Sequence, residues 1–255
     1  EMCIRDRSQC LLMKQLIQIK LSMKNLNKYF LSIIFISLVT FLSAEENIYE
    51  YKIRFKIKNV ISLDGIKELT SKGNDSYHII FTGKNRMLNA ELNQEAEFKY
   101  LNSKVFPKYY SQKIKVPLRG VLKQTIEYDF KNQKIASSGD VNWVIDFLGE
   151  STPLDPISSG FQIRENVKKG LTNFEINLIK LDEGLIYKSS YSVVGEEVLE
   201  IKDTKYPCIV LERTTNNRKT LYYVAKTLDF ILIKVEDDRK ERMISIEAEK
   251  ILSFG

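Results

Sequence analysis

Apolar and charged residues alternate without a break from Tyr49 to Lys58, and this pattern constrains the fold more than any other feature of the sequence. The apolar set is Tyr49, Tyr51, Ile53, Phe55 and Ile57. Because successive side chains of a strand point to opposite faces, the period of two predicts a half-buried β-strand. The other face carries the cationic row Lys52, Arg54, Lys56 and Lys58. We interpret this row as a solvated strand face, and contact with anionic lipid head groups is the alternative.

Most of the remaining chain has the pattern of short strands separated by turns. Further strands are predicted at 66–70, 77–82, 105–116, 122–130, 133–137, 174–181, 185–194, 197–201, 208–214, 220–225, 230–235 and 243–251. Residues 86–101 fit a helix in places, but their pattern favours a strand. The expected connections are 63–66, 72–75, 131–132, 182–184, 202–207, 216–217, 227–229 and 237–240. No repeat or linker divides this part of the chain.

One helix is expected, and both of its ends carry sequence signals. Asp155 can accept bonds from free backbone amides, Pro156 suits the first helical position, and the helix should end at 168–170. An apolar stripe at helical spacing contains Ile157, Phe161, Ile163, Arg164 and Val167. The sequence therefore predicts a mainly β fold, either a curved antiparallel sheet or an open β-barrel-like meander, with one internal α-helix packed against it.

The beginning of the chain resembles an export signal. A short basic stretch from Met23 is followed by a mostly apolar run at 30–42, and small residues precede the acidic pair that starts at Glu45. We expect a cleavable signal peptide at 23–44, cut after Ala44, and a periplasmic product without a transmembrane span, because the run is shorter than the roughly 20 residues that cross a bilayer. Residues 1–22 are interpreted as non-native upstream translation, and 45–255 as a single β-rich domain.

Charge and cysteine content exclude two classes of protein. The formal net charge of +6 comes mostly from residues 1–44, so the expected domain lacks the basic excess of a nucleic-acid binder. Cys3 and Cys10 leave with the leader, and Cys208 alone stays in the domain. An intramolecular disulfide is therefore excluded, and we expect Cys208 to pack as a small hydrophobe.

Residues that commonly carry catalysis are sparse. His78 lies in a predicted strand, and one imidazole with one thiol does not make a metal site, so neither a metal nor a cofactor is expected. A serine elbow and a phosphate loop are absent from the sequence. Carboxylates gather before the helix and near residue 196, and a pair of them could hydrolyse a glycan. These are Asp140, Asp146, Glu150, Asp155, Glu196 and Glu197. We expect no enzyme activity.

A few large side chains are candidates for lining a ligand cleft. Trp143 and Phe147 lie in an apolar run before the helix, and they could either line a cleft or complete the core beneath the helix. Arg164 could pair with a buried carboxylate or hold an anionic ligand group. The residues proposed to line a ligand are Trp143, Phe147, Phe161, Arg164 and Tyr222.

Four stretches of the chain carry a resemblance to a known family. They are the strand that opens at 49–51, the helix start at 155–158 with Phe161-Gln162-Ile163-Arg164, the segment 191–199, and 218–225 running into 228–236. In order and spacing the chain resembles the bacterial exported family called domain of unknown function 3108. It departs from the family's pattern at Tyr222-Tyr223, where a tryptophan is common, and at Ile233, where a proline is frequent. The resemblance implies a strand-rich periplasmic protein of a Gram-negative bacterium and assigns no catalytic residue.

Three functions are compatible with these features. The leading hypothesis is a non-catalytic periplasmic protein that binds an apolar or amphiphilic envelope component, a lipid for example, on the concave side of a curved sheet capped by the helix. The second is a structural protein of envelope assembly that binds a partner protein through an exposed strand edge. The third is a carboxylate-based hydrolase acting on envelope glycan.

Overall fold

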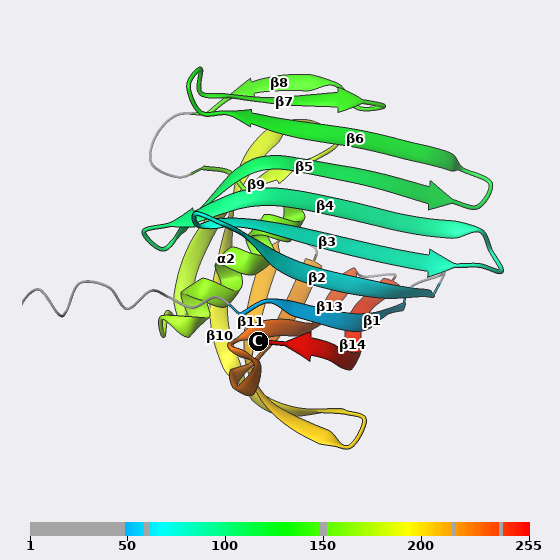
Figure 1. The fold of residues 1–255 in the computed structure, drawn as a ribbon, viewed down its shortest axis with the longest axis vertical. Coiled ribbons are helices and arrows are strands. Elements are labelled where there is room, and N and C mark those ends of the chain that lie inside the picture. The colour runs from blue at the N-terminus through cyan, green and yellow to red at the C-terminus, as the bar shows by residue number, and fades with distance from the viewer. Residues whose placement is uncertain (1–48, 59–61, 148–151, 216–217, 240–241) are drawn as a thin grey trace, which may run out of the picture. The chain divides into compact units, whose positions relative to one another are not determined.

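The strands of the domain form one antiparallel sheet in which strands that follow one another in sequence are paired, except β8 and β9, which lie at its two ends (Figure 1). The computed structural model describes residues 49–58, 62–147, 152–215, 218–239 and 242–255. The strands are β1 (Tyr51–Lys58), β2 (Leu63–Gly73), β3 (Ser76–Asn85), β4 (Ala90–Leu101), β5 (Lys104–Val116), β6 (Gly120–Asp129), β7 (Lys134–Gly139), β8 (Trp143–Asp146), β9 (Asn173–Lys180), β10 (Leu185–Ile201), β11 (Thr204–Thr215), β12 (Arg218–Ala225), β13 (Ile231–Arg239) and β14 (Arg242–Phe254). The first strand pairs with the last, so the order across the sheet is β8 to β1 followed by β14 to β9.

The alternation that opens the sequence forms β1 as predicted. Its apolar side chains from Tyr51 to Ile57 are buried, whereas the cationic row points outward. Carboxylates on the neighbouring strands pair with most of this row: Lys52 with Glu68, Lys56 with Glu249 and Lys58 with Glu247. The row is therefore a solvated face in which ion pairs screen most of the charge.

The one α-helix among the described residues is α2 (Pro156–Lys168), and it begins and ends where the sequence predicts. Asp155 caps it by accepting hydrogen bonds of 2.9 Å from the amides of Ile157 and Ser158. Gly170 follows its end with a φ of 79°, a conformation that glycine adopts without strain. The helix contacts β4, β5, β9 and β13, which belong to both halves of the sheet. The sheet thus curves around α2, which confirms the predicted fold class.

Several predicted connections are wrong because a glycine or a polar residue lies inside a strand. Residues 63–65 begin β2 instead of forming a turn, and a Cβ on Gly65 would lie 2.5 Å from the carbonyl oxygen of Thr82, so this glycine permits close packing of strands. The two strands predicted at 185–194 and 197–201 are the single strand β10, in which Gly195 adjoins a bulge. Asp237 was expected in a connection but is buried in β13, where Arg218 neutralises it.

The two ends of the sheet are connected by side-chain hydrogen bonds to a backbone carbonyl and not by strand pairing. Trp143 of β8 donates its indole N–H to the carbonyl oxygen of Leu181 at 2.8 Å, and Gln124 of β6 donates to the same oxygen at 2.7 Å. Leu181 follows β9, and the indole also covers Gly184, which precedes β10. We call these two bonds the Leu181 contact. It holds β8, at one edge of the sheet, close to the turn that follows β9, at the other edge.

The Leu181 contact leads to a testable prediction at Gly184. This residue has a φ of 69°, and an added Cβ would lie 2.7 Å from the indole of Trp143. Gly184→Ala should therefore cost about 1 kcal/mol for the backbone conformation and a further 1–3 kcal/mol, roughly, for overpacking, measured by urea unfolding. Gly73→Ala is the matched control, because Gly73 has a φ of 75° with open space around its Cβ position. Equal losses in the two variants would contradict the packing of Trp143 on this turn.

Candidate functional site

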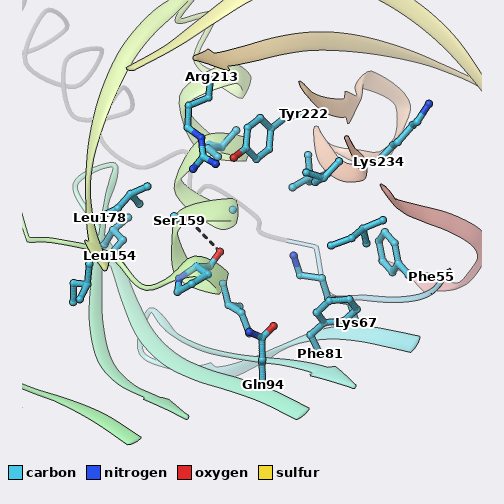
Figure 2. Close-up of a pocket in the computed structure, with 18 of the residues that line it drawn as sticks. Phe55, Lys67, Phe81, Gln94, Leu154, Ser159, Leu178, Arg213, Tyr222 and Lys234 are labelled. Carbon is cyan, nitrogen blue, oxygen red and sulfur yellow. Dashed lines mark hydrogen bonds between the residues drawn. The ribbon is translucent and has the colours of Figure 1, made fainter. Parts of the chain in front are cut away.

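A cavity of about 330 Å³ lies between the first half of α2 and the concave face of the sheet (Figure 2). Its volume falls near the lower end of the range of about 300–1,000 Å³ typical of small-molecule pockets. Both halves of the sheet contribute to it. The lining residues are Phe55, Lys67, Phe81, Gln94, Leu154, Pro156, Ile157, Ser159, Gly160, Ile163, Leu178, Ile179, Tyr187, Arg213, Arg218, Tyr222, Leu232, Lys234, Val235 and Ile246.

Most of the residues that line this cavity are apolar, and polar and cationic side chains supply the rest of its wall. The rings of Phe55 and Phe81 meet edge to face, with centroids 6.1 Å apart, on one side of it. Ile157 and Ile163 of the helix and Leu178 of β9 supply aliphatic surface. Each square ångström of apolar surface that a ligand removes from water contributes about 25 cal/mol to binding. A wall of this kind favours a molecule with a hydrocarbon part.

Two cationic side chains of the wall are neutralised by carboxylates. Arg218 forms two hydrogen bonds with the carboxylate of Asp237. Lys234 lies 2.8 Å from a carboxylate oxygen of Glu236, and its ammonium group also lies over the ring of Tyr223. These pairs leave little net charge at their side of the cavity.

Two other cations, Lys67 and Arg213, face the same cavity without an ion pair to any carboxylate in the described part of the chain (Figure 2). A Cβ on Gly160 would lie 3.8 Å from the ammonium nitrogen of Lys67, which places that nitrogen beside the helix. The guanidinium of Arg213 donates to the hydroxyl of Thr220 at 3.2 Å and lies over the ring of Tyr222. The hydroxyl of Thr220 in turn donates to Asp237 at 3.1 Å, so neither cation has a direct carboxylate partner among the described residues.

The phenol of Tyr222 contributes no negative charge to balance these cations. Burial raises the pKa of Tyr222 far above its ordinary value, with a further increase from the neighbouring Tyr191. The two rings meet edge to face at 5.6 Å, and Arg213 lies over the ring of Tyr222. Tyr222 is therefore neutral at physiological pH, and it offers the cavity an aromatic face.

The structure brings one of the five predicted lining residues, Tyr222, to the cavity. Phe161 packs against other aromatic rings under α2, Arg164 pairs with Asp229, and Phe147 contacts Phe130. Trp143 is half-buried at the end strand of the sheet, where it forms the Leu181 contact. These four side chains thus lie outside the described lining of the cavity.

Sequence reasoning missed Lys67, Arg213 and Gly160. A signal for Lys67 exists, because it stands in phase with Leu69 in β2 and pairs with the buried Ile53 of β1, so a charged residue occupies an inward position. Gly160 carries a weaker signal, since a glycine inside a helix has an energetic cost that a packing or functional reason must offset. Arg213 has no comparable signal in the sequence.

Three of the acidic residues considered for hydrolysis have separate partners of their own. Asp155 caps the helix, Asp140 accepts a hydrogen bond from the amide of Lys123 at 2.7 Å, and Glu196 pairs with Lys226. Burial raises the pKa of Asp155, and the amides that it caps act in the opposite direction. The remaining candidates are Asp146 and Glu197, which are exposed, and Glu150, which lies outside the described residues.

Other residues with reactive side chains have structural contacts. His78 lies 2.8 Å from a carboxylate oxygen of Glu95 on the adjacent strand. Cys208 is buried, and burial raises the pKa of its thiol to about 11, so the thiol is protonated at neutral pH. Among the residues that the structure describes, no three His, Cys, Asp or Glu side chains are grouped to hold a metal ion. No helix within the described ranges is long and apolar enough to span a bilayer.

Comparisons with known proteins show similarity of fold alone. No family model matches the chain, and no curated protein matches it. The crystal structure of a β-barrel-like protein of domain of unknown function DUF1849 from Brucella abortus is similar with a TM-score of 0.52 and 8% identity, over 79% of this chain and 96% of that one. A DUF1329 family protein from Desulfovibrio piger ATCC 29098 has 11% identity over 80% of this chain and 83% of that one, with a TM-score of 0.25, too low to support an argument. Membership of the family named domain of unknown function 3108 stays a prediction, and the fold that the comparisons show is β-barrel-like.

Proposed function

We propose that this protein binds one apolar or amphiphilic molecule, without catalysis, in the cavity between α2 and the concave face of the sheet. The observation that carries the proposal is a volume of about 330 Å³ lined by apolar side chains, with several polar and cationic ones among them, from the helix and both halves of the sheet. An envelope component is the proposed ligand, and the periplasm is the proposed location. Both rest on the expected signal peptide at 23–44, which lies outside the described residues.

The anchoring of α2 supports a cavity that exists before a ligand enters. Arg164 and Lys168 on the helix both bond to Asp229, which follows the short 3-10 helix η1 (Lys226–Leu228). On another side Phe161 packs into a ring cluster with Phe98 of β4 at a centroid distance of 4.8 Å. Because the helix is tied to both halves of the sheet, the opposing walls are held apart at a set distance. Such pre-organisation lowers the entropic cost of binding.

Gly160 gives a direct test of this proposal. A Cβ at this position would meet nothing closer than Lys67 Nζ at 3.8 Å and a Leu232 methyl group at 3.9 Å, so a larger side chain enters the cavity without displacing backbone. Gly160→Leu should therefore fill the cavity and weaken binding of the uncharged fluorescent probe N-phenyl-1-naphthylamine, by roughly tenfold or more if about 1.4 kcal/mol of contact is lost. The measurement is a fluorescence titration of the exported, purified protein.

The matched control at the same position is Gly160→Ala. It adds one methyl group, should leave most of the cavity open, and should raise the free energy of unfolding by about 0.5–1 kcal/mol because glycine is unfavourable in a helix. Both variants are expected to fold. Equal probe binding by the wild type and Gly160→Leu, or no binding by the wild type, would refute the proposal.

The two alternative functions have less support from the described residues. For a partner bound at a strand edge, β8 offers only four residues, and the outer edge of β9 already exchanges hydrogen bonds with Leu154 at 2.8 and 3.1 Å. For a glycan hydrolase, two carboxylates must face each other across a cleft. Asp140 and Asp155 instead bond to separate backbone amides.

A further inference from the structure

We infer that the ligand of the proposed cavity is a single-chain amphiphile with an acidic head group, a carboxylate or a phosphate, held by Lys67 and Arg213. This inference rests on the proposed function and adds to it the chemical class of the ligand. It depends on three independent features of the cavity, which are its unbalanced charge, an unsatisfied guanidinium nitrogen, and its size.

The charge of the cavity is the first feature. Of the cations that line it, Arg218 and Lys234 have carboxylate partners, whereas Lys67 and Arg213 have none among the described residues. A cation is costly to hold in apolar surroundings unless an anion compensates it. Lys67 projects from the concave face near Phe81 (Figure 2), and Leu232 also lines the cavity. A bound anion would supply the missing compensation.

The second feature is the environment of Arg213. Its Nε is buried and has no hydrogen-bond partner in the structure. Buried polar groups in native proteins are nearly always hydrogen-bonded, so an unsatisfied one calls for a missing partner. A guanidinium group presents a planar set of donors that suits carboxylate and phosphate oxygens. Tyr187 and Tyr222 line the same wall, and Figure 2 shows Arg213 and Tyr222 directed into the cavity.

The third feature is the size of the cavity. A volume of about 330 Å³ is close to the minimum for a small-molecule pocket, and aliphatic and aromatic residues form the larger part of its lining. One hydrocarbon chain fits such a space better than two chains do. The combination of one chain and one acidic head distinguishes this ligand from a neutral lipid, a diacyl lipid and a cationic amphiphile.

The test is displacement of bound N-phenyl-1-naphthylamine by four amphiphiles with the same twelve-carbon chain, namely dodecanoate, dodecyl phosphate, dodecanol and dodecyltrimethylammonium. Wild-type protein should prefer the two acids over the alcohol by on the order of tenfold, because hydrogen bonds to charged groups are worth that much. The cationic amphiphile should compete least. Whichever of dodecanoate and dodecyl phosphate displaces the probe at the lower concentration identifies the preferred head group.

Two variants assign the preference to residues. Lys67→Met keeps the length of the side chain and removes its charge, and because Lys67 has no ion pair with a described residue, the variant should fold. It should lower the preference for acids several-fold, and Lys67→Met combined with Arg213→Gln should abolish it. Lys188→Gln is the control, since it removes a positive charge from an exposed position of β10, where Lys188 pairs with Glu175 at 3.0 Å. The control should keep the full preference.

The outcomes separate this inference from the proposed function. Equal displacement by dodecanol and the two acids in the wild type would overturn the acidic head group and leave the proposed cavity intact. A preference that Lys67→Met and the double variant both retain would overturn the assignment to these residues. Where the double variant fails to unfold cooperatively, Lys67→Met alone decides. Failure of the probe to bind at all would refute the proposed function itself.

Discussion

Replacing Arg164 by methionine should lower the free energy of unfolding by about 3–5 kcal/mol, the usual cost of removing one partner from a buried ion pair. Arg164 is 2% exposed, and its guanidinium donates to both the side chain and the backbone carbonyl of Asp229. It also lies 3.5 Å from a carboxylate oxygen of the buried Glu165. The methionine fills similar space, so the loss measured by urea unfolding reports the charge and not a cavity.

Lys168→Met is the control for this experiment. Lys168 is on the same helix and its ammonium lies 3.0 Å from the carboxylate of Asp229, but its side chain is partly exposed. Its replacement should cost about 0–1 kcal/mol, as for an ion pair near the surface. A loss at Arg164 no greater than that at Lys168 would contradict the structural role of the buried pair.

The single substitution Phe161→Ala should also lower the free energy of unfolding of the wild-type protein, by about 3–5 kcal/mol. Phe161 is 3% exposed and sits among three aromatic rings of β3 and β4. Its centroid lies 4.8 Å from Phe98, 5.4 Å from Tyr100 and 5.8 Å from Tyr77. The truncation removes the transfer energy of the ring and leaves a space that the surrounding rings cannot fill by collapse.

An aromatic residue at the end of the central strand β14 provides the comparison. Phe254 is 37% exposed and contacts Tyr49 with centroids 5.2 Å apart, so Phe254→Ala should cost roughly 1 kcal/mol, in line with the partial burial of one side chain. Thermal and urea unfolding of both variants check the prediction. Comparable losses at the two positions would mean that the ring cluster beneath α2 does not hold the helix.

These two predictions concern two residues that the sequence offered as possible ligand contacts, with pairing to a buried carboxylate as the alternative for Arg164. Arg164 and Phe161 face the interior of the domain and tie α2 to the sheet, whereas Gly160 and Ile163 on the same helix face the cavity. The helix therefore acts as a wall whose position depends on its anchors. We expect Arg164→Met and Phe161→Ala to affect binding through the loosening of that wall.

The sequence by itself determined the elements whose signals are local. Alternation over a few residues predicts β1, because side-chain direction in a strand depends only on its own backbone. Asp155 and Gly170 mark the ends of α2, because a cap satisfies backbone groups within a few residues of itself. The turn at Asn74-Asp75 was predicted for the same reason, and both residues have positive φ there. From these elements the predicted fold class follows.

Only the tertiary structure decided which residues share the cavity. Lys67 of β2 and Arg213 of β11 lie far apart in the chain. They line the same cavity because β1 pairs with β14 and the sheet curves around the helix. Asp237 belongs to a strand interior because Arg218 on the neighbouring strand neutralises it, and no local pattern reveals that partner. Pairing register, curvature and packing volume arise from the whole set of long-range contacts, so the site became visible only when the chain was folded.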